Sequence, residues 1–269
     1  METLGVIGNI SRDVAIYSGS PGAEILGGAA LHVSLGATSA GLSAAPVTVI
    51  GADLEWITRD PRLAALDMRN VEIVPGRSCE FRLTYGSNGD LTGTDASYGA
   101  AKYLTGHALS VIGAHGSCHV CCRQPLDSAL VLDRLVAEGI PFSIDFHLAS
   151  ANVAMRAVQP ALALARTVFV NAAEFAVLAH ITNPATLSRV VISDGPHAAV
   201  VLRHGRVASS AMPSAVRAVE VTGAGDTLAG TFLAASARGL GDAAALRAAV
   251  SAASESVCRP GLRIRRGGG

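Results

Sequence analysis

The sequence predicts an α/β protein with a central, mostly parallel sheet flanked by helices, and a second, small β-sheet that forms a lid. Half of the 269 residues are hydrophobic, which is enough for a large core. From about residue 108 onward, strand-like and helical segments alternate, as in a parallel sheet covered on both faces. Earlier segments, at about 13–27 and 77–95, indicate a small separate sheet. We therefore expect one domain over residues 1–269 with these two segments as its lid.

The individual elements follow from apolar runs, helical periodicity, and the positions of glycine and proline. The strands expected in the main sheet are 4–7, 47–50, 71–74, 117–122, 141–146, 167–170 and 198–202, with 207–210 beside the last. The helices expected are 29–40, 56–69, 126–138, 151–165 with a break near Pro160, a segment from about 172, 224–238 and 242–257. The segment 187–193 is ambiguous.

The lid is predicted from the alternation of its side chains. Phe81, Leu83 and Tyr85 alternate with polar residues, so one face of the strand is apolar and the other polar. Asn88-Gly89 follows this strand and is a strong hairpin signal. The alternating face suggests a homodimer formed through the lid, and a monomer with a covering flap fits equally well.

Charge and composition exclude several classes of function. The net charge is zero, which argues against nucleic-acid and membrane-surface partners, and no apolar run has the character of a membrane span. No signal peptide opens the chain, and the odd count of five cysteines suits a reducing cytoplasm. The first strand lacks the Gly-x-Gly-x-x-Gly of a dinucleotide-binding oxidoreductase. The run Cys118-His119-Val120-Cys121-Cys122 lacks the second ligand pair of a structural zinc site, so buried thiols are the favoured interpretation.

A glycine-rich turn before a helix is the first candidate for chemistry. Gly223, Ala224 and Gly225 precede Asp226, and an apolar helical pattern follows. The first N–H groups of a helix have no intrahelical partner, and together with the helix dipole they form an anion site. Asp226 in such a site fits a base that takes a proton from a hydroxyl while the N–H groups stabilise negative charge on a phosphoryl group. On the local pattern alone, a simple helix cap is an equally good interpretation.

Polar residues also follow the predicted strands, namely Asn9, Asp13, Asp145, His147, Asn171 and Glu174. All would fall on one edge of the sheet, where such sheets bind their ligands. An edge with acids but few lysines suits a hydroxylated ligand and a metal-bound phosphate. Mg²⁺ needs only one or two carboxylates, because it keeps several waters. Taken alone, Asn171 and Glu174 also fit an ordinary helix capping box, which is the favoured interpretation.

The chain resembles the ribokinase-like (PfkB) family of sugar and nucleoside kinases over nearly its whole length. Four features match in order, namely Gly8-Asn9 with Asp13, Gly27-Gly28, Asn171-x-x-Glu174 and Gly223-Ala224-Gly225-Asp226. The resemblance implies an ATP-dependent, Mg²⁺-dependent phosphotransferase that phosphorylates a hydroxymethyl group of a sugar, nucleoside or related polyol. A non-catalytic module that binds a nucleotide or sugar on the same fold is the alternative.

The resemblance also implies roles for individual residues. Asp226 would be the general base, and the N–H groups of Gly223, Ala224 and Gly225 would form the anion hole. The residues expected to hold the acceptor are Asn9, Asp13, Gly27, Gly28 and His32, and Arg123 joins them because it lies at a strand end. The residues expected to bind the nucleotide are Asn171, Glu174, Arg203, Gly205 and Thr222, with Glu174 holding Mg²⁺ through water.

The sequence departs from the family pattern in several places. His32 and His147 stand where asparagine is usual in the family. Glu220-Val221 replaces Asp-Thr before the glycine-rich turn, which bears on a monovalent-cation site. The nucleotide loop, at residues 203–206, is shorter and has fewer glycines than in the family.

Overall fold

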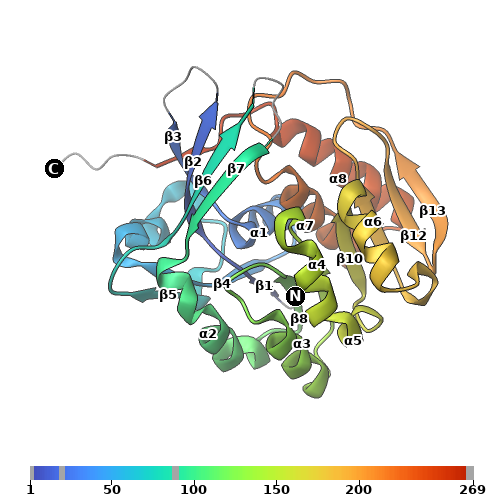
Figure 1. Ribbon diagram of the computed structural model, residues 1–269, viewed down its shortest axis with the longest axis horizontal. Helices are drawn as coiled ribbons and strands as arrows, with labels where there is room; N and C mark the ends of the chain where they lie inside the picture. Colours follow the sequence, from blue (N-terminus) through green and yellow to red (C-terminus); the bar gives the residue numbers. More distant parts are fainter. Residues whose placement is uncertain (1–2, 18–21, 87–90, 265–269) are drawn as a thin grey trace.

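The computed structural model describes residues 3–17, 22–86 and 91–264, which form a large sheet, a small sheet and the surrounding helices (Figure 1). The large sheet has nine strands in the order β13-β12-β11-β10-β9-β8-β1-β4-β5. These strands are β1 (Leu4–Ile7), β4 (Ala44–Gly51), β5 (Val71–Val74), β8 (Ser117–Cys121), β9 (Phe142–Asp145), β10 (Thr167–Asn171), β11 (Val190–Ser193), β12 (Ala199–Arg203) and β13 (Arg206–Ala211). Neighbours pair in parallel from β5 to β11, while β12 and β13 form an antiparallel edge. The predicted central, mostly parallel sheet is confirmed.

The central strands are buried on both faces. Every residue of β1 and β4 is buried, as expected for parallel strands with helices on both sides. At the edge, His204 and Gly205 take positive φ angles of 47° and 73°. This is the backbone of a tight two-residue hairpin, and the chain therefore passes directly from β12 into β13.

The helices lie in two layers, one on each face of the large sheet. They are α1 (Ala29–Ser39), α2 (Leu104–Val111), α3 (Ser128–Ala137), α4 (Ala151–Ala157), α5 (Gln159–Leu162), α6 (Ala172–Ile181), α7 (Ala224–Ala237) and α8 (Asp242–Ser256). Side chains of α1, α7 and α8 pack against Val6 and Phe169 in one core. Side chains of α2, α3, α4 and α6 pack against Ile7 and Val120 in the other. The side chains of adjacent residues in one strand thus pack into opposite cores.

The helices α1 and α7 approach each other unusually closely. A Cβ at Gly36 of α1 would lie 2.7 Å from the backbone oxygen of Thr227, and one at Gly230 of α7 would lie 2.1 Å from the backbone oxygen of Val33. Glycine is therefore required at both positions, because any side chain would force the two backbones apart.

The small sheet forms the lid, with the order β14-β3-β2-β6-β7. Its strands are β2 (Ser11–Tyr17), β3 (Ala23–Gly27), β6 (Cys79–Tyr85), β7 (Leu91–Ser97) and β14 (Leu262–Arg263). Figure 1 shows it at the upper left, rising away from the large sheet. The strands expected in the lid are confirmed, whereas the hairpin turn predicted at Asn88-Gly89 lies outside the described residues.

One expected helix is wrong, two elements were not predicted, and the structure resolves one ambiguous segment. The segment 56–69 is not one α-helix but a series of 3-10 turns, because Asp60 leaves helical conformation and caps the next turn at Pro61. The helix α2 and the strand β14 have no counterpart among the predicted elements. The ambiguous segment 187–193 contains strand β11. Within the described residues, no helix combines the length and apolar character needed to cross a membrane.

Candidate active site

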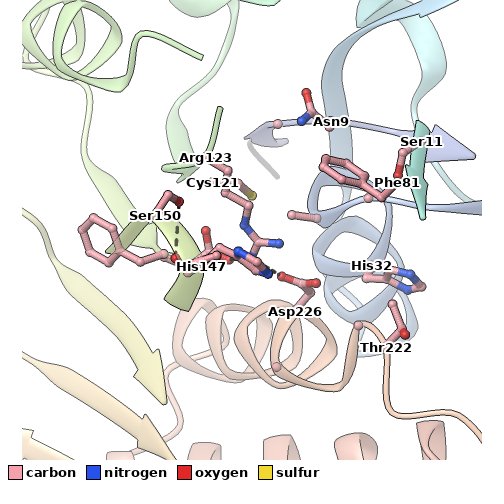
Figure 2. Close-up of a pocket in the computed structure, with 18 of the residues that line it drawn as sticks. Asn9, Ser11, His32, Phe81, Cys121, Arg123, His147, Ser150, Thr222 and Asp226 are labelled. Carbon is pink, nitrogen blue, oxygen red and sulfur yellow. Dashed lines mark hydrogen bonds and ion pairs between the residues drawn. The ribbon is translucent and has the colours of Figure 1, made fainter. Parts of the chain in front are cut away.

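A pocket of about 660 Å³ lies between the carboxyl ends of the central strands, the lid, and the first turns of α1 and α7. The polar residues that the sequence places on one edge of the sheet all line it, namely Asn9, Asp13, Asp145, His147, Asn171, Glu174 and Asp226. Of the other residues expected in the site, the pocket is lined by Gly28, His32, Arg123, Thr222, Gly223 and Gly225. Figure 2 labels ten of the residues that line the pocket, with Asp226 at the start of α7.

The glycine-rich turn forms the N-terminus of α7 and faces the pocket. Gly223 is the N-cap and adopts a left-handed conformation with a φ of 79°. A Cβ at Gly223 would lie 2.5 Å from the ring of His32, whereas a Cβ at Gly225 would meet no atom within 4 Å. The turn is thus packed on one side and open on the other. Its open side presents the first N–H groups of the helix to the pocket, where they can bind an anion.

Arg123 joins two carboxylates at the centre of the site. One guanidinium nitrogen of Arg123 lies 2.8 Å from Asp226 and 2.8 Å from Asp145, and Figure 2 shows its side chain reaching Asp226. Burial opposes ionisation of Asp145, but the charge of Arg123 holds the pKa of that carboxyl at about 2. One positive charge is therefore shared between two carboxylates.

Asp13 is held beside the glycine pair that precedes α1. The hydroxyl of Ser11 donates to Asp13 at 2.7 Å. Burial, with a smaller contribution from the nearby Asp226 carboxylate, raises the pKa of Asp13 to about 7, although the Ser11 hydrogen bond opposes this shift. A Cβ at Gly27 would lie 1.9 Å from the Asp13 carboxylate, and one at Gly28 would lie 2.2 Å from a backbone oxygen. Both glycines therefore make room for the acid and its strand.

Asn171 and Glu174 form a complete capping box at the start of α6. The side chain of Asn171 accepts from the Glu174 backbone N–H at 2.8 Å, and the side chain of Glu174 accepts from the Asn171 backbone N–H at 2.9 Å. Burial raises the pKa of Glu174 to about 7. The cap interpretation is correct, yet it does not exclude a role in binding, because both side chains also line the pocket.

The donor set of the pocket fits Mg²⁺. Glu174, Asp145 and Asp226 bring carboxylate oxygens to one cavity, and hard cations prefer oxygen ligands and retained water. Only one oxygen of Glu174 is used by the capping box. The residue can therefore serve the helix and a hydrated cation together.

The two histidines of the pocket are half-buried. Burial lowers the pKa of both His32 and His147. His32 has no hydrogen-bond partner for Nε2 within the described residues, and it packs beneath Gly223. Close to it, Glu220 accepts hydrogen bonds from the backbone N–H and the hydroxyl of Thr222, at 3.0 and 2.7 Å. The segment before the glycine-rich turn is thereby held in place.

Two residues expected to bind the nucleotide are not brought to this pocket. The guanidinium of Arg203 binds Asp242 at 2.6 and 2.9 Å. Gly205 lies in the β12–β13 turn, against Ala185. Neither residue lines the pocket. Their part in nucleotide binding stays a prediction. To bind a nucleotide, Arg203 would have to break its ion pair with Asp242.

Several residues line the pocket to which the sequence gives no specific role. Asp145 and His147 have a recognisable signal, because each follows a predicted strand. Phe81 and Leu83 were expected on the apolar face of the lid, and this face turns out to cover the pocket. Ser11, which fixes Asp13, has no local signal. The predicted dimer through the lid stays a prediction.

The fold and the site together define the class of protein. A large mostly parallel sheet, a five-stranded lid, and an acid at a helix N-terminus facing the space between them characterise the ribokinase-like α/β fold. The chain belongs to the pfkB family of carbohydrate kinases, whose family model matches residues 3–265. It is accordingly a carbohydrate or nucleoside kinase.

Individual relatives agree with this family. A cytidine kinase from Thermococcus kodakarensis is 33% identical over 93 residues, which is 34% of this chain and 33% of that protein; the match thus spans about one third of the curated relative. A nucleoside kinase from Burkholderia thailandensis in complex with inosine has a TM-score of 0.77 at 20% identity, covering 96% of this chain and 92% of that chain. A putative ribokinase II from E. coli in complex with ATP and Mg²⁺ has a TM-score of 0.79 at 19% identity, covering 97% and 94%. The structural likeness concerns the fold.

Proposed function

We propose that the chain transfers the terminal phosphoryl group of ATP to a hydroxymethyl group of a nucleoside or sugar. The observation that carries the proposal is the position of Asp226. It lies in the first turn of α7, beside the backbone of Gly223 and Gly225, and it lines the same pocket as these glycines and Asp13. The Ala224 N–H donates to the Val221 oxygen at 3.3 Å and would turn to the phosphoryl group when it binds. A base and an anion site are thus adjacent to a carboxylate suited to bind hydroxyl groups.

In this proposal Asp226 accepts the proton of the attacking hydroxyl. The hydroxyl oxygen forms the new bond to phosphorus as the bond to ADP breaks, and negative charge spreads over the phosphoryl oxygens. The N–H groups of Gly223, Ala224 and Gly225 stabilise that charge, because they are already oriented by the helix. Mg²⁺, when bound with ATP near Glu174, would neutralise phosphate charge. The lid excludes water that would otherwise accept the phosphoryl group.

Arg123 has two roles in the proposal. Its guanidinium fixes the orientation of Asp226 while also holding Asp145, and it is the one arginine or lysine among the described residues that line the pocket. We assign it to the acceptor side, because it follows strand β8 and lies close to Asn9. Asn9 donates to the backbone oxygen of Gln124 and keeps a buried side-chain oxygen without a partner among the described residues. That oxygen can accept from an acceptor hydroxyl.

A nucleoside acceptor is favoured over a free sugar by the lid. Phe81, Leu83 and Tyr98 line the pocket on the side of Asp13. Aromatic and aliphatic side chains suit the flat face of a base better than a hydroxyl-rich sugar ring. The Thermococcus and Burkholderia relatives named above, a cytidine kinase and a nucleoside kinase bound to inosine, agree with this choice.

The proposal is tested by ADP formation with a panel of nucleosides and sugars, in the presence of ATP and Mg²⁺. Asp226→Asn should lower kcat by about 10²–10⁴-fold, as expected for loss of a general base. Asp133→Asn, on the exposed face of α3, is the matched control. Arg123→Ala should raise the KM for the acceptor. Turnover by Asp226→Asn near the wild-type rate would exclude Asp226 as the base, and an unchanged acceptor affinity in Arg123→Ala would remove Arg123 from the acceptor site.

A further inference from the structure

Three potential metal ligands meet at the wall of the pocket, and of the three only Asp145 also belongs to the carboxylate set described above for Mg²⁺. In the parallel pairing of β8 and β9, Cys121 lies opposite Asp145 and His119 lies opposite Ser143. Positions two apart on a strand point to the same face, so His119 and Cys121 share a face with Asp145 beside them. One ligand atom from each of the three lies within 4.8 Å of the others.

Two buried polar atoms in this group have no hydrogen-bond partner among the described residues, although Nε2 of His119 lies 3.8 Å from Oδ2 of Asp145. They are Nε2 of His119 and Oδ1 of Asp145, on residues that are 0% and 5% exposed. Buried polar groups normally find a hydrogen-bond partner, and an exception needs a physical reason. A shared ligand between these atoms and the Cys121 thiol supplies that reason.

The surroundings of His119 are those of a metal ligand. Its Nδ1 lies 2.9 Å from the hydroxyl of Ser143, which leaves Nε2 directed at the group. Metal-bound histidines commonly have such a partner on the second ring nitrogen. The ring also packs edge-on against Phe169, with the centroids 5.7 Å apart. This contact fixes the ring plane and keeps that side dry.

We propose that His119, Cys121 and Asp145 form a binding site for a divalent transition metal of the zinc type. Imidazole nitrogen, thiolate and carboxylate are the ligands that Zn²⁺ prefers, whereas Mg²⁺ prefers oxygen alone. Three protein ligands leave a fourth position open. Cys121 and Asp145 line the pocket, so the ion can enter from the pocket and take its fourth ligand, a water, from there.

The charges of the group are compatible with a dication. Arg123 binds Oδ2 of Asp145 at 2.8 Å and leaves Oδ1 for the metal. On coordination the Cys121 thiol loses its proton to solvent, and the sulfur forms the bond to the metal. Thiolate and carboxylate then oppose the two positive charges of the ion. Because the Asp145 carboxylate is already ionised beside Arg123, binding adds one net positive charge to the site. Cys118 and Cys122 take no part, because they belong to the core on the opposite face of β8.

The experiment uses the full chain with Cys258→Ser as background, because Cys258 is an exposed thiol. Co²⁺ serves as the probe, since a cobalt–thiolate bond gives a charge-transfer absorption. We expect one ion per chain, an absorption band of this kind, and its loss on addition of Zn²⁺ but not of Mg²⁺. The band should vanish in Cys121→Ser and persist in Cys118→Ser, the matched change on the other face. Ser143→Ala should weaken the affinity by about 10–100-fold.

The Cys258→Ser protein, with all three proposed ligands present, already shows whether Co²⁺ binds through a thiolate. The test therefore does not depend on whether a ligand variant folds. No thiolate band in the folded protein at saturating Co²⁺ would overturn the proposal and indicate a buried water between His119 and Asp145. A band that survives in Cys121→Ser would also overturn it. Kinase activity enters neither measurement, so this result is independent of the proposed phosphoryl transfer.

Discussion

Asp13 is expected to destabilise the folded chain when it is ionised. Burial raises its pKa to about 7 from an ordinary 3.8, so the folded state retains a proton that the unfolded state has lost. The difference is about 3 pKa units, and each unit corresponds to about 1.4 kcal/mol. Replacing Asp13 with asparagine removes the charge and keeps an oxygen for the Ser11 hydroxyl. The free energy of unfolding should therefore rise, by at most about 4 kcal/mol.

The gain should depend on pH with a defined sign. Below pH 3.8 the folded and unfolded states both carry the proton, so the substitution brings nothing. As the pH rises from 3.8 toward about 7, only the unfolded state ionises and the wild-type chain loses stability. The advantage of Asp13→Asn should be about 2 kcal/mol near pH 5.5, reaching its plateau above about pH 7.

Urea unfolding at several pH values between about 5 and 8 measures this advantage. Asp133→Asn, on the exposed face of α3, controls for the change of residue type. The same Asp13→Asn protein should have a higher KM for the acceptor, because stability at a binding site is commonly gained at the expense of function. An advantage that is constant with pH, or that shrinks as the pH rises, would refute the assignment of a buried, proton-retaining Asp13.

Two further pairs of substitutions separate structural from functional roles. Gly27→Ala should raise the acceptor KM, because its Cβ displaces the Asp13 side chain. Gly28→Ala instead meets backbone at a φ of 101° and should lose more than about 2 kcal/mol in urea unfolding. Equal losses of stability in the two variants would contradict this. Asn171→Ala should lower stability by about 1 kcal/mol through loss of the cap. Glu174→Gln keeps the capping oxygen, and so should leave Tm undiminished while raising the Mg²⁺ concentration needed for half-maximal activity; an unchanged Mg²⁺ requirement would argue against its metal role.

Local signals predicted most of the sheet and its helices. The strands of the central sheet are short apolar runs between turn residues, and the capping box at Asn171 and Glu174 is encoded within four residues. The segment 56–69 was mispredicted as a helix because a moderate apolar periodicity outweighed the effect of Asp60-Pro61 on the backbone. Strand β14 is only two residues long, and it exists through its pairing with β3.

The polar connections within the site could not be predicted, because they depend on distances across the fold. Arg123 and Asp226 are separated by 103 positions in the chain, and nothing near either residue indicates the other. The relation of Asp145 to Cys121 depends on strand order and on a register fixed only when β8 and β9 pair. Likewise, the raised pKa of Asp13 is a consequence of its burial at the base of lid strand β2, where the strand meets the pocket.

The close contact of α1 with α7 separates two tasks within the molecule. Gly28 caps α1 and Gly223 caps α7, so the proposed acceptor site and the proposed anion hole lie at the ends of one pair of helices. The spacing of this pair is set by Gly36 and Gly230. The lid and the strand ends lie outside this pair. Substitutions in the lid and at the strand ends can therefore change acceptor preference without moving the two helices. At Gly36 and Gly230, by contrast, even an added methyl group would shift both helix ends, so the geometry of phosphoryl transfer cannot be adjusted there in small steps.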